Sequence, residues 1–154
     1  MLETPHVAVG IAIATKYGNP WIAIPLSFAS HFVLDKIPHW NPHLFTETQK
    51  TGKPSRQSTI IGATDITLSL ILGFFFAYRA LPNTQMAILI LACSFASVLS
   101  DVVKYPYFYF NLRQKWLVSW VKIERAIQVD TKTVLPGLIT QAVVIGASLW
   151  WIFN

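Results

Sequence analysis

Five long runs of apolar residues dominate the chain, and turn-forming residues separate them. Gly18-Asn19-Pro20 divides the first run from the second, and Pro82-Asn83-Thr84 divides the third from the fourth. The pattern predicts helices at about 4–17, 20–37, 58–81, 85–110 and 134–153. Runs of roughly 20 apolar residues are long enough to cross a bilayer. The sequence therefore predicts an all-α fold, a polytopic membrane helix bundle of about five helices with a short first helix.

Two further segments have a different pattern. At about 112–128, apolar residues recur at helical spacing, and charged residues occupy other positions, namely Arg113, Lys115, Lys122, Glu124 and Arg125. The apolar set is Leu112, Trp116, Leu117, Trp120, Ile123 and Ile127. This pattern predicts an interfacial amphipathic helix whose tryptophans face the acyl chains. The stretch 38–57 is polar, basic and proline-containing, which predicts a loop.

The composition agrees with a membrane class. Of 154 residues, 53% are hydrophobic and only 12% are charged, against roughly a quarter charged in a typical soluble domain. Residues 1–154 are therefore expected to form a single integral membrane domain. Cys93 is the only cysteine, which excludes an internal disulfide.

The basic residues predict the orientation. If the first two helices form a hairpin, all but Lys16 and Arg79 of the 12 Lys and Arg residues lie on one side of the membrane. The positive-inside rule then places the N-terminus, the loop 38–57 and the segment 111–133 in the cytoplasm, and the protein in the inner or plasma membrane as a multi-pass protein. The net charge of +5 is thus interpreted as topology and contact with anionic lipid headgroups, with no nucleic acid as partner.

The end of the second helix carries the candidate chemistry. His31 and Asp35 are one helical turn apart and share a face. Pro38 ends this helix, so that His39 can turn back over its end, whereas His43 lies beyond Pro42 and is expected among the headgroups. Imidazole and carboxylate together are ligands that zinc, iron and manganese prefer.

Two carboxylates lie inside the later apolar runs, Asp65 and Asp101. A carboxylate in a spanning helix is costly and usually functional. At 1.5 Å per residue, both lie about 10 Å below the cytoplasmic boundary, as does His31. A short first helix brings His6 to the same depth. The predicted metal ligands are therefore His6, His31, Asp35, His39, Asp65 and Asp101. They would hold one or two divalent ions, zinc being the expected metal, and the alternative is a structural cluster of buried ion pairs.

The pattern of His6 and Gly10, then Ser30-His31-x-x-Leu34-Asp35 and Pro38-His39, resembles the small bacterial membrane-bound metal-dependent hydrolases. The resemblance covers roughly residues 4–43. The His-x-x-x-Asp pair is also similar to the zinc site of the phospholipase C and P1 nuclease group, which cleave phosphoesters. These resemblances imply a zinc-dependent hydrolase.

We therefore expect a membrane-embedded, metal-dependent hydrolase whose substrate is a membrane lipid, a phospholipid or lipid-phosphate ester of the cytoplasmic leaflet. Asp35, Asp101 and Lys104 are the candidate catalytic residues. Lys104 and Arg56 can bind a phosphate, or be ordinary basic residues that extend toward the headgroups. The alternatives are a metal-ion or proton transporter that uses the same carboxylates and an assembly factor whose polar cluster only joins helices.

Overall fold

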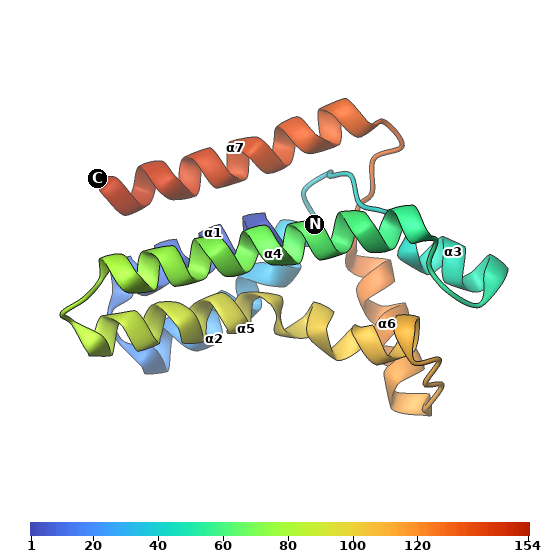
Figure 1. Cartoon of the computed structure of the whole chain (residues 1–154), viewed down its shortest axis with the longest axis horizontal. Coiled ribbons are helices and arrows are strands. Elements are labelled where there is room, and N and C mark those ends of the chain that lie inside the picture. The colour runs from blue at the N-terminus through green and yellow to red at the C-terminus, as the bar shows by residue number, and fades with distance from the viewer.

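The computed structural model describes residues 1–154 and consists of seven α-helices joined by turns and loops, with no strands (Figure 1). The helices are α1 (Glu3–Tyr17), α2 (Pro20–Asp35), α3 (Leu44–Thr51), α4 (Arg56–Arg79), α5 (Thr84–Tyr109), α6 (Lys115–Ile127) and α7 (Val134–Phe153). The all-helical class predicted from the sequence is thus confirmed. The long helices end close to the predicted positions because Gly18, Asn19 and Asn83 cap or interrupt them.

One element was missing from the prediction. The segment 38–57, expected to be a loop, contains the eight-residue helix α3. Glu47 on α3 accepts hydrogen bonds from the Ser55 amide at 2.7 Å and from the Ser58 hydroxyl at 2.9 Å, at the start of α4. Burial would raise the pKa of Glu47, but these hydrogen bonds and one from the Ser55 hydroxyl lower it below its usual range. The Glu47 carboxylate therefore fixes α3 against α4.

Three helices are long and apolar enough to cross a membrane: α4, α5 and α7, with mean hydropathies of 1.9, 2.2 and 1.5. The helices α1 and α2 have 15 and 16 residues, fewer than the roughly 20 that a span usually needs. The structure is thus compatible with a membrane protein, and the expected count of about five spans plus an interfacial helix is not confirmed.

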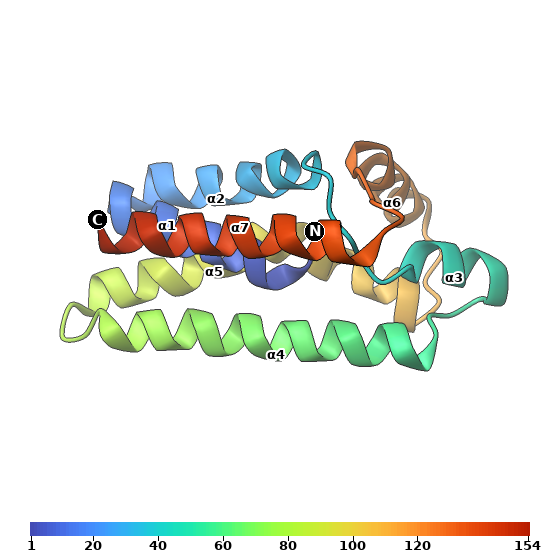
Figure 2. The same ribbon diagram turned by 90° about the horizontal axis from the view of Figure 1, so that it is seen from above.

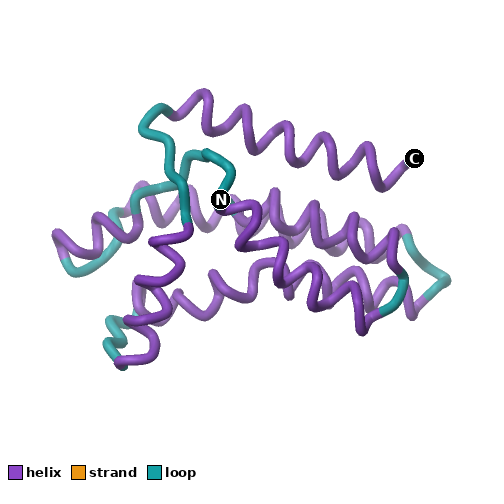
Figure 3. Tube along the Cα trace, turned by 180° about the vertical axis from the view of Figure 1, so that it is seen from behind, coloured by secondary structure: helices purple, strands orange, loops and turns teal.

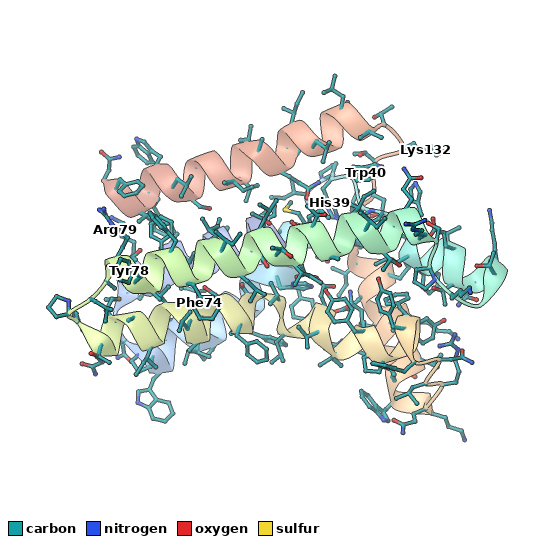
Figure 4. All side chains as sticks on the ribbon, viewed as in Figure 1. His39, Trp40, Phe74, Tyr78, Arg79 and Lys132 are labelled. Carbon is teal, nitrogen blue, oxygen red and sulfur yellow. The ribbon has the colours of Figure 1, made fainter.

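The exterior of the bundle is apolar while its interior holds polar groups. Leu70, Ile71 and Phe74 on α4 are more than half exposed, at 54, 60 and 59%, and Figure 4 shows Phe74 and Tyr78 along the same helix. By contrast, the imidazoles His6, His31 and His39 are completely buried. Many large exposed apolar side chains together with fully buried imidazoles are unusual in water-soluble domains and are compatible with a lipid surrounding.

Helix α1 lies at the centre, in contact with α2, α4, α5 and α7. Gly10 permits its close approach to α5, since a Cβ atom there would lie 2.7 Å from the Cys93 carbonyl oxygen. An apolar cluster fills the bundle on the Tyr17 side of Gly10, and includes Ile11, Ala14, Phe76, Ile90 and Cys93.

The connections gather at two ends of the long axis. Figures 2 and 3 show the turns between α1 and α2 and between α4 and α5 at one end, together with the C-terminus. The longer connections, α3 and α6 lie at the other end. The N-terminus lies about midway along the axis in both views, so that α1 stops short of the end where α3 and α6 lie.

Candidate metal centre

His31, on the last turns of α2, has one ring nitrogen in a hydrogen bond and one without a hydrogen-bond partner. Its Nδ1 lies 3.0 Å from the Ser97 carbonyl oxygen on α5. A carbonyl only accepts, so Nδ1 carries the proton and donates it. In the neutral ring, Nε2 then has a free lone pair, and it is buried without a hydrogen-bond partner. A hydrogen bond from the second nitrogen to a carbonyl is the usual setting of a metal-binding histidine.

His6 lies against His31, because α1 and α2 pack side by side. The two rings stack with centroids 4.3 Å apart at an angle of 22°. Neither nitrogen of His6 has a hydrogen-bond partner, and the nearest carboxylate is Asp35, whose Oδ1 lies 3.4 Å from Nε2. An imidazole that is fully buried with both nitrogens unpaired is costly unless a ligand satisfies it.

Carboxylates from three helices face the His31 Nε2 atom. Asp35 Oδ2 lies at 3.6 Å, Asp101 Oδ2 at 3.9 Å and Glu124 Oε1 at 3.9 Å. These distances are too long for hydrogen bonds. Potential ligand atoms of His6, His31 and Asp101 all lie within 4.8 Å of one another. This set, called the metal group below, can hold a metal ion.

Lys104 links the carboxylates on its side of the metal group. Its Nζ lies 2.5 Å from Asp101 Oδ1, one turn away on α5, and it also contacts Glu124 on α6. The three side chains are buried or nearly so. Lys104 thus offsets part of the negative charge and holds Asp101 and Glu124 in place. Burial raises the pKa of Glu124, and the charge of Lys104 opposes that rise.

His39 lies on the connection after α2 and faces the opposite oxygen of Asp35, with 3.8 Å between His39 Nε2 and Asp35 Oδ1. Burial lowers its pKa, and the nearby α-amino group of Met1 lowers it further. Figure 4 shows His39 and Trp40 between the start of α7 and the rest of the bundle. Gln141 on α7 fixes this connection by donating to the Trp40 carbonyl at 2.7 Å and accepting from the Leu2 amide at 2.9 Å.

Asp65 on α4 is buried but lies outside the metal group. Its two oxygens accept hydrogen bonds from the Glu3 amide at 2.5 Å, the Thr4 amide at 3.2 Å and the Thr4 hydroxyl at 2.6 Å. The N-cap residue of α1, Leu2, makes no side-chain cap. Asp65 therefore caps α1 from a neighbouring helix. Its predicted role as a metal ligand stays a prediction.

A cavity of about 410 Å³ adjoins the metal group. Asp101 and Lys104 lie in its wall, with Arg125 of α6, and apolar side chains such as Leu44, Phe45 and Phe108 line other parts. A polar cavity of about 440 Å³ shares the lining residues His43, Thr46, Arg125 and Asp130 with it. The two cavities are thus adjacent, and Asp101 is the member of the metal group that lines the first of them.

The structure brings together most of the residues expected from the sequence. His6, His31, Asp35, Asp101 and Lys104 converge, His39 lies beside Asp35, and His43 is exposed at the start of α3. Arg56 is exposed and lines neither of the two cavities, where Arg125 is found instead.

Sequence reasoning missed two acidic residues, Glu124 and Asp130. Glu124 lies three and seven residues after Val121 and Leu117, on the same buried face of α6, and this spacing was a signal that it points inward. Asp130 had no such signal, because backbone pairing between distant segments places it beside His39.

No protein-family model, curated protein or solved structure matches this chain. The interpretation of the site therefore rests on its geometry and chemistry.

Proposed function

We propose that the protein is a membrane-embedded, metal-dependent hydrolase that acts on a phospholipid or lipid-phosphate ester of the cytoplasmic leaflet. The observation that carries this proposal is the metal group beside an amphipathic cavity. His6 and His31 have buried nitrogens without hydrogen-bond partners next to Asp101. The same cavity wall carries Lys104 and Arg125.

The topology belongs to the proposal. We infer that α1 and α2 also cross the membrane as a hairpin, with α1 among the longer helices and α2 packed against α1 and α5. In this arrangement α6 lies in the headgroup plane, and the connections that hold most of the basic residues face the cytoplasm of an inner or plasma membrane. The metal group then lies below the cytoplasmic boundary, within reach of a lipid headgroup.

The cavity lining supports a lipid substrate. Phe45, Phe108 and Ile66 offer an apolar surface for an acyl chain. The two cations, Lys104 and Arg125, suit a phosphate, and Arg125 can bind one through two parallel hydrogen bonds. A water-soluble phosphoester has no acyl chain to contact the apolar side chains of the cavity.

The reaction is addition of water to phosphorus, with cleavage of the bond to the leaving oxygen, which takes up a proton and departs as an alcohol. A bound divalent ion supplies a Lewis acid and lowers the pKa of water. Asp101 and Asp35 would serve as ligands, and the proton of the attacking water would pass to solvent. Lys104 holds Asp101 and Glu124 and offsets the negative charge of the phosphate.

A transporter, the alternative, needs polar groups that continue through the bundle. The apolar cluster around Ile11, Ile90 and Cys93 packs between α1 and α5 on the side away from the metal group. This packing favours a site that opens on one side only.

The test is hydrolysis by purified protein in detergent, loaded with Zn²⁺, with short-chain phosphatidic acid and phosphatidylglycerol as substrates. Product is measured by mass spectrometry. We expect hydrolysis that a chelator abolishes and Zn²⁺ restores. His31→Gln and Asp101→Asn should lower kcat/KM by more than about 100-fold, because loss of a ligand removes the ion.

Lys53→Ala is the matched control, since Lys53 is exposed and lines neither cavity. It should retain wild-type activity. If the metal-loaded protein cleaves neither lipid, or if His31→Gln and Asp101→Asn cleave as fast as Lys53→Ala, the proposal is wrong.

A further inference from the structure

Asp35 presents its two oxygens to different histidines. Oδ2 lies 3.6 Å from His31 Nε2, whereas Oδ1 lies 3.8 Å from His39 Nε2 and 3.4 Å from His6 Nε2. The α-amino group of Met1 contacts Oδ1 in this structure, and an ion bound at this oxygen would replace it. Oδ1 thus lies near both His6 of the metal group and His39 outside it, and a carboxylate within reach of both is suited to bridge two cations.

The Nδ1 atom of His39 is fixed by a backbone carbonyl, as it is in His31. It lies 2.6 Å from the Ile37 carbonyl oxygen, so this nitrogen carries the proton and donates it. The neutral ring therefore has its lone pair on Nε2, directed toward Asp35 and toward Asp130 Oδ1 at 3.9 Å. The two carboxylate oxygens repel this lone pair, and either a neighbouring amide hydrogen or a bound cation can offset the repulsion.

Backbone hydrogen bonds and the Arg125 side chain hold Asp130 beside His39. The His39 amide donates to the Val129 carbonyl at 3.2 Å, and the Thr131 amide donates to the His39 carbonyl at 2.7 Å. These bonds form a parallel bridge between His39 and Asp130. Arg125 contacts Asp130 Oδ2. Oδ1 is left buried without a hydrogen-bond partner.

Two amides complete the surroundings of His39 Nε2. Asn41 Nδ2 lies at 3.0 Å and Gln128 Nε2 at 3.4 Å. The buried Asn41 Oδ1 has no partner. The nitrogen and oxygen of an amide exchange places on a half turn, so Asn41 can present this oxygen to a cation instead.

We propose that His39, Asp130 and Asp35 form a second site for a divalent transition-metal ion, and that Asp35 bridges this ion to the one in the metal group. The inference rests on the proposed function, since it makes the proposed hydrolase a two-metal enzyme. Two ions about 3.5–4 Å apart stabilise both the attacking and the leaving oxygen of a phosphoester in an in-line displacement. A second ion fits the phosphoester substrate of the proposed function and gives Asp130 the role of a ligand.

The first experiment measures zinc per chain by elemental analysis after dialysis of purified protein against Zn²⁺. Wild type should hold two equivalents. His39→Gln and Asp130→Asn should each hold one, because the metal group remains. Asp35→Asn should weaken both sites. Glu47→Gln, a change of the same kind outside the cluster, should keep two equivalents.

The second experiment needs no variant and therefore does not depend on how well the variants fold. Wild type is loaded with Mn²⁺ and examined by electron paramagnetic resonance. Two ions joined by one carboxylate couple magnetically and give a spectrum unlike the simple hyperfine pattern of an isolated ion. The coupled spectrum is expected.

The outcomes separate the two proposals. One equivalent of zinc with an uncoupled Mn²⁺ spectrum overturns the second site, while chelator-sensitive hydrolysis would leave the proposed function standing. If His39→Gln and Asp130→Asn each still hold two equivalents of zinc, the second site is likewise overturned. If wild type holds no zinc and cleaves no lipid, both proposals are wrong.

Discussion

Both carboxylate oxygens of Asp65 face the first amides of α1 rather than the imidazole rings. The first amides of a helix have no partner within the helix, and those of α1 are partly buried. A carboxylate there satisfies two donors and interacts favourably with the helix dipole. At the scale of single residues, the cost of burying this acid is therefore offset by the helix start that it caps.

This placement gives a prediction that separates a cap from a ligand. Asp65→Ala should lower the free energy of unfolding by about 0.5–2 kcal/mol, the usual cost of losing a helix cap. Zinc content should be unchanged, because Asp65 lies outside the metal group. Unfolding is followed by helical circular dichroism in detergent, and zinc by elemental analysis.

The control for Asp65→Ala is Thr64→Ala, on the exposed side of the same turn. It should leave both quantities near wild type. Loss of zinc in Asp65→Ala, but not in Thr64→Ala, would instead make Asp65 a ligand.

Some site residues can be predicted from local spacing in the sequence, whereas others depend on contacts between distant segments. The spacing of His31 and Asp35 is local, and a helix puts both on one face, so the sequence alone predicts the pair. Their setting is different, because the Ser97 carbonyl that orients His31 comes from another helix. Asp130 depends on backbone pairing between 35–39 and 129–131, and no periodicity in the sequence indicates this contact.

At the scale of elements, the separation of α1 from α5 sets the geometry of the metal group, because His6 lies on α1 and Asp101 on α5. Gly10, one turn after His6, permits this separation. A side chain at position 10 would meet the Cys93 backbone, which cannot move aside without shifting α5.

Gly10→Ala should therefore weaken zinc binding although it changes no ligand. We expect the dissociation constant for Zn²⁺ to rise roughly 10-fold or more, and stability to fall by about 1–3 kcal/mol from overpacking. Competition with a zinc-sensitive dye measures the first quantity and thermal unfolding the second.

Gly146→Ala on α7 is the control, since a Cβ there meets nothing within 4 Å. It should bind zinc like wild type and be at least as stable, because alanine favours helix more than glycine. Equal zinc affinity in Gly10→Ala and Gly146→Ala would contradict the role of helix separation.

Long apolar helices are well predicted from the sequence, whereas α3 is not. Apolar runs bounded by Gly18, Pro20 and Pro82 leave few alternatives for the ends of the long helices. Helix α3 has eight residues and a polar sequence, so periodicity and length both argue for a loop. It is held instead by the contacts of Glu47 with residues 55 and 58.

At the scale of the whole molecule, the two ends of the bundle differ in charge, and this asymmetry predicts orientation. A single cysteine introduced at Lys53 should be labelled by a membrane-impermeant thiol reagent only after cells are opened. One at Asn83 should be labelled in intact cells. Both positions are exposed, and the native Cys93 is completely buried, so it should contribute no background.

Labelling is measured by the mass shift of the purified chain. The control is the unchanged protein, in which only Cys93 is present. Labelling of the Asn83→Cys variant solely in opened cells, with Lys53→Cys labelled in intact cells, would reverse the proposed orientation and place the metal group on the outer side.

The two hydrogen bonds that join Gln141 to Trp40 and Leu2 can form only late in the synthesis of the chain. Gln141 lies on α7, later in the chain than every candidate ligand. While the ribosome is still making α7, the connection that carries His39 lacks this attachment. If the metal group binds zinc as proposed, the complete site would be available to the ion only after translation has passed residue 141.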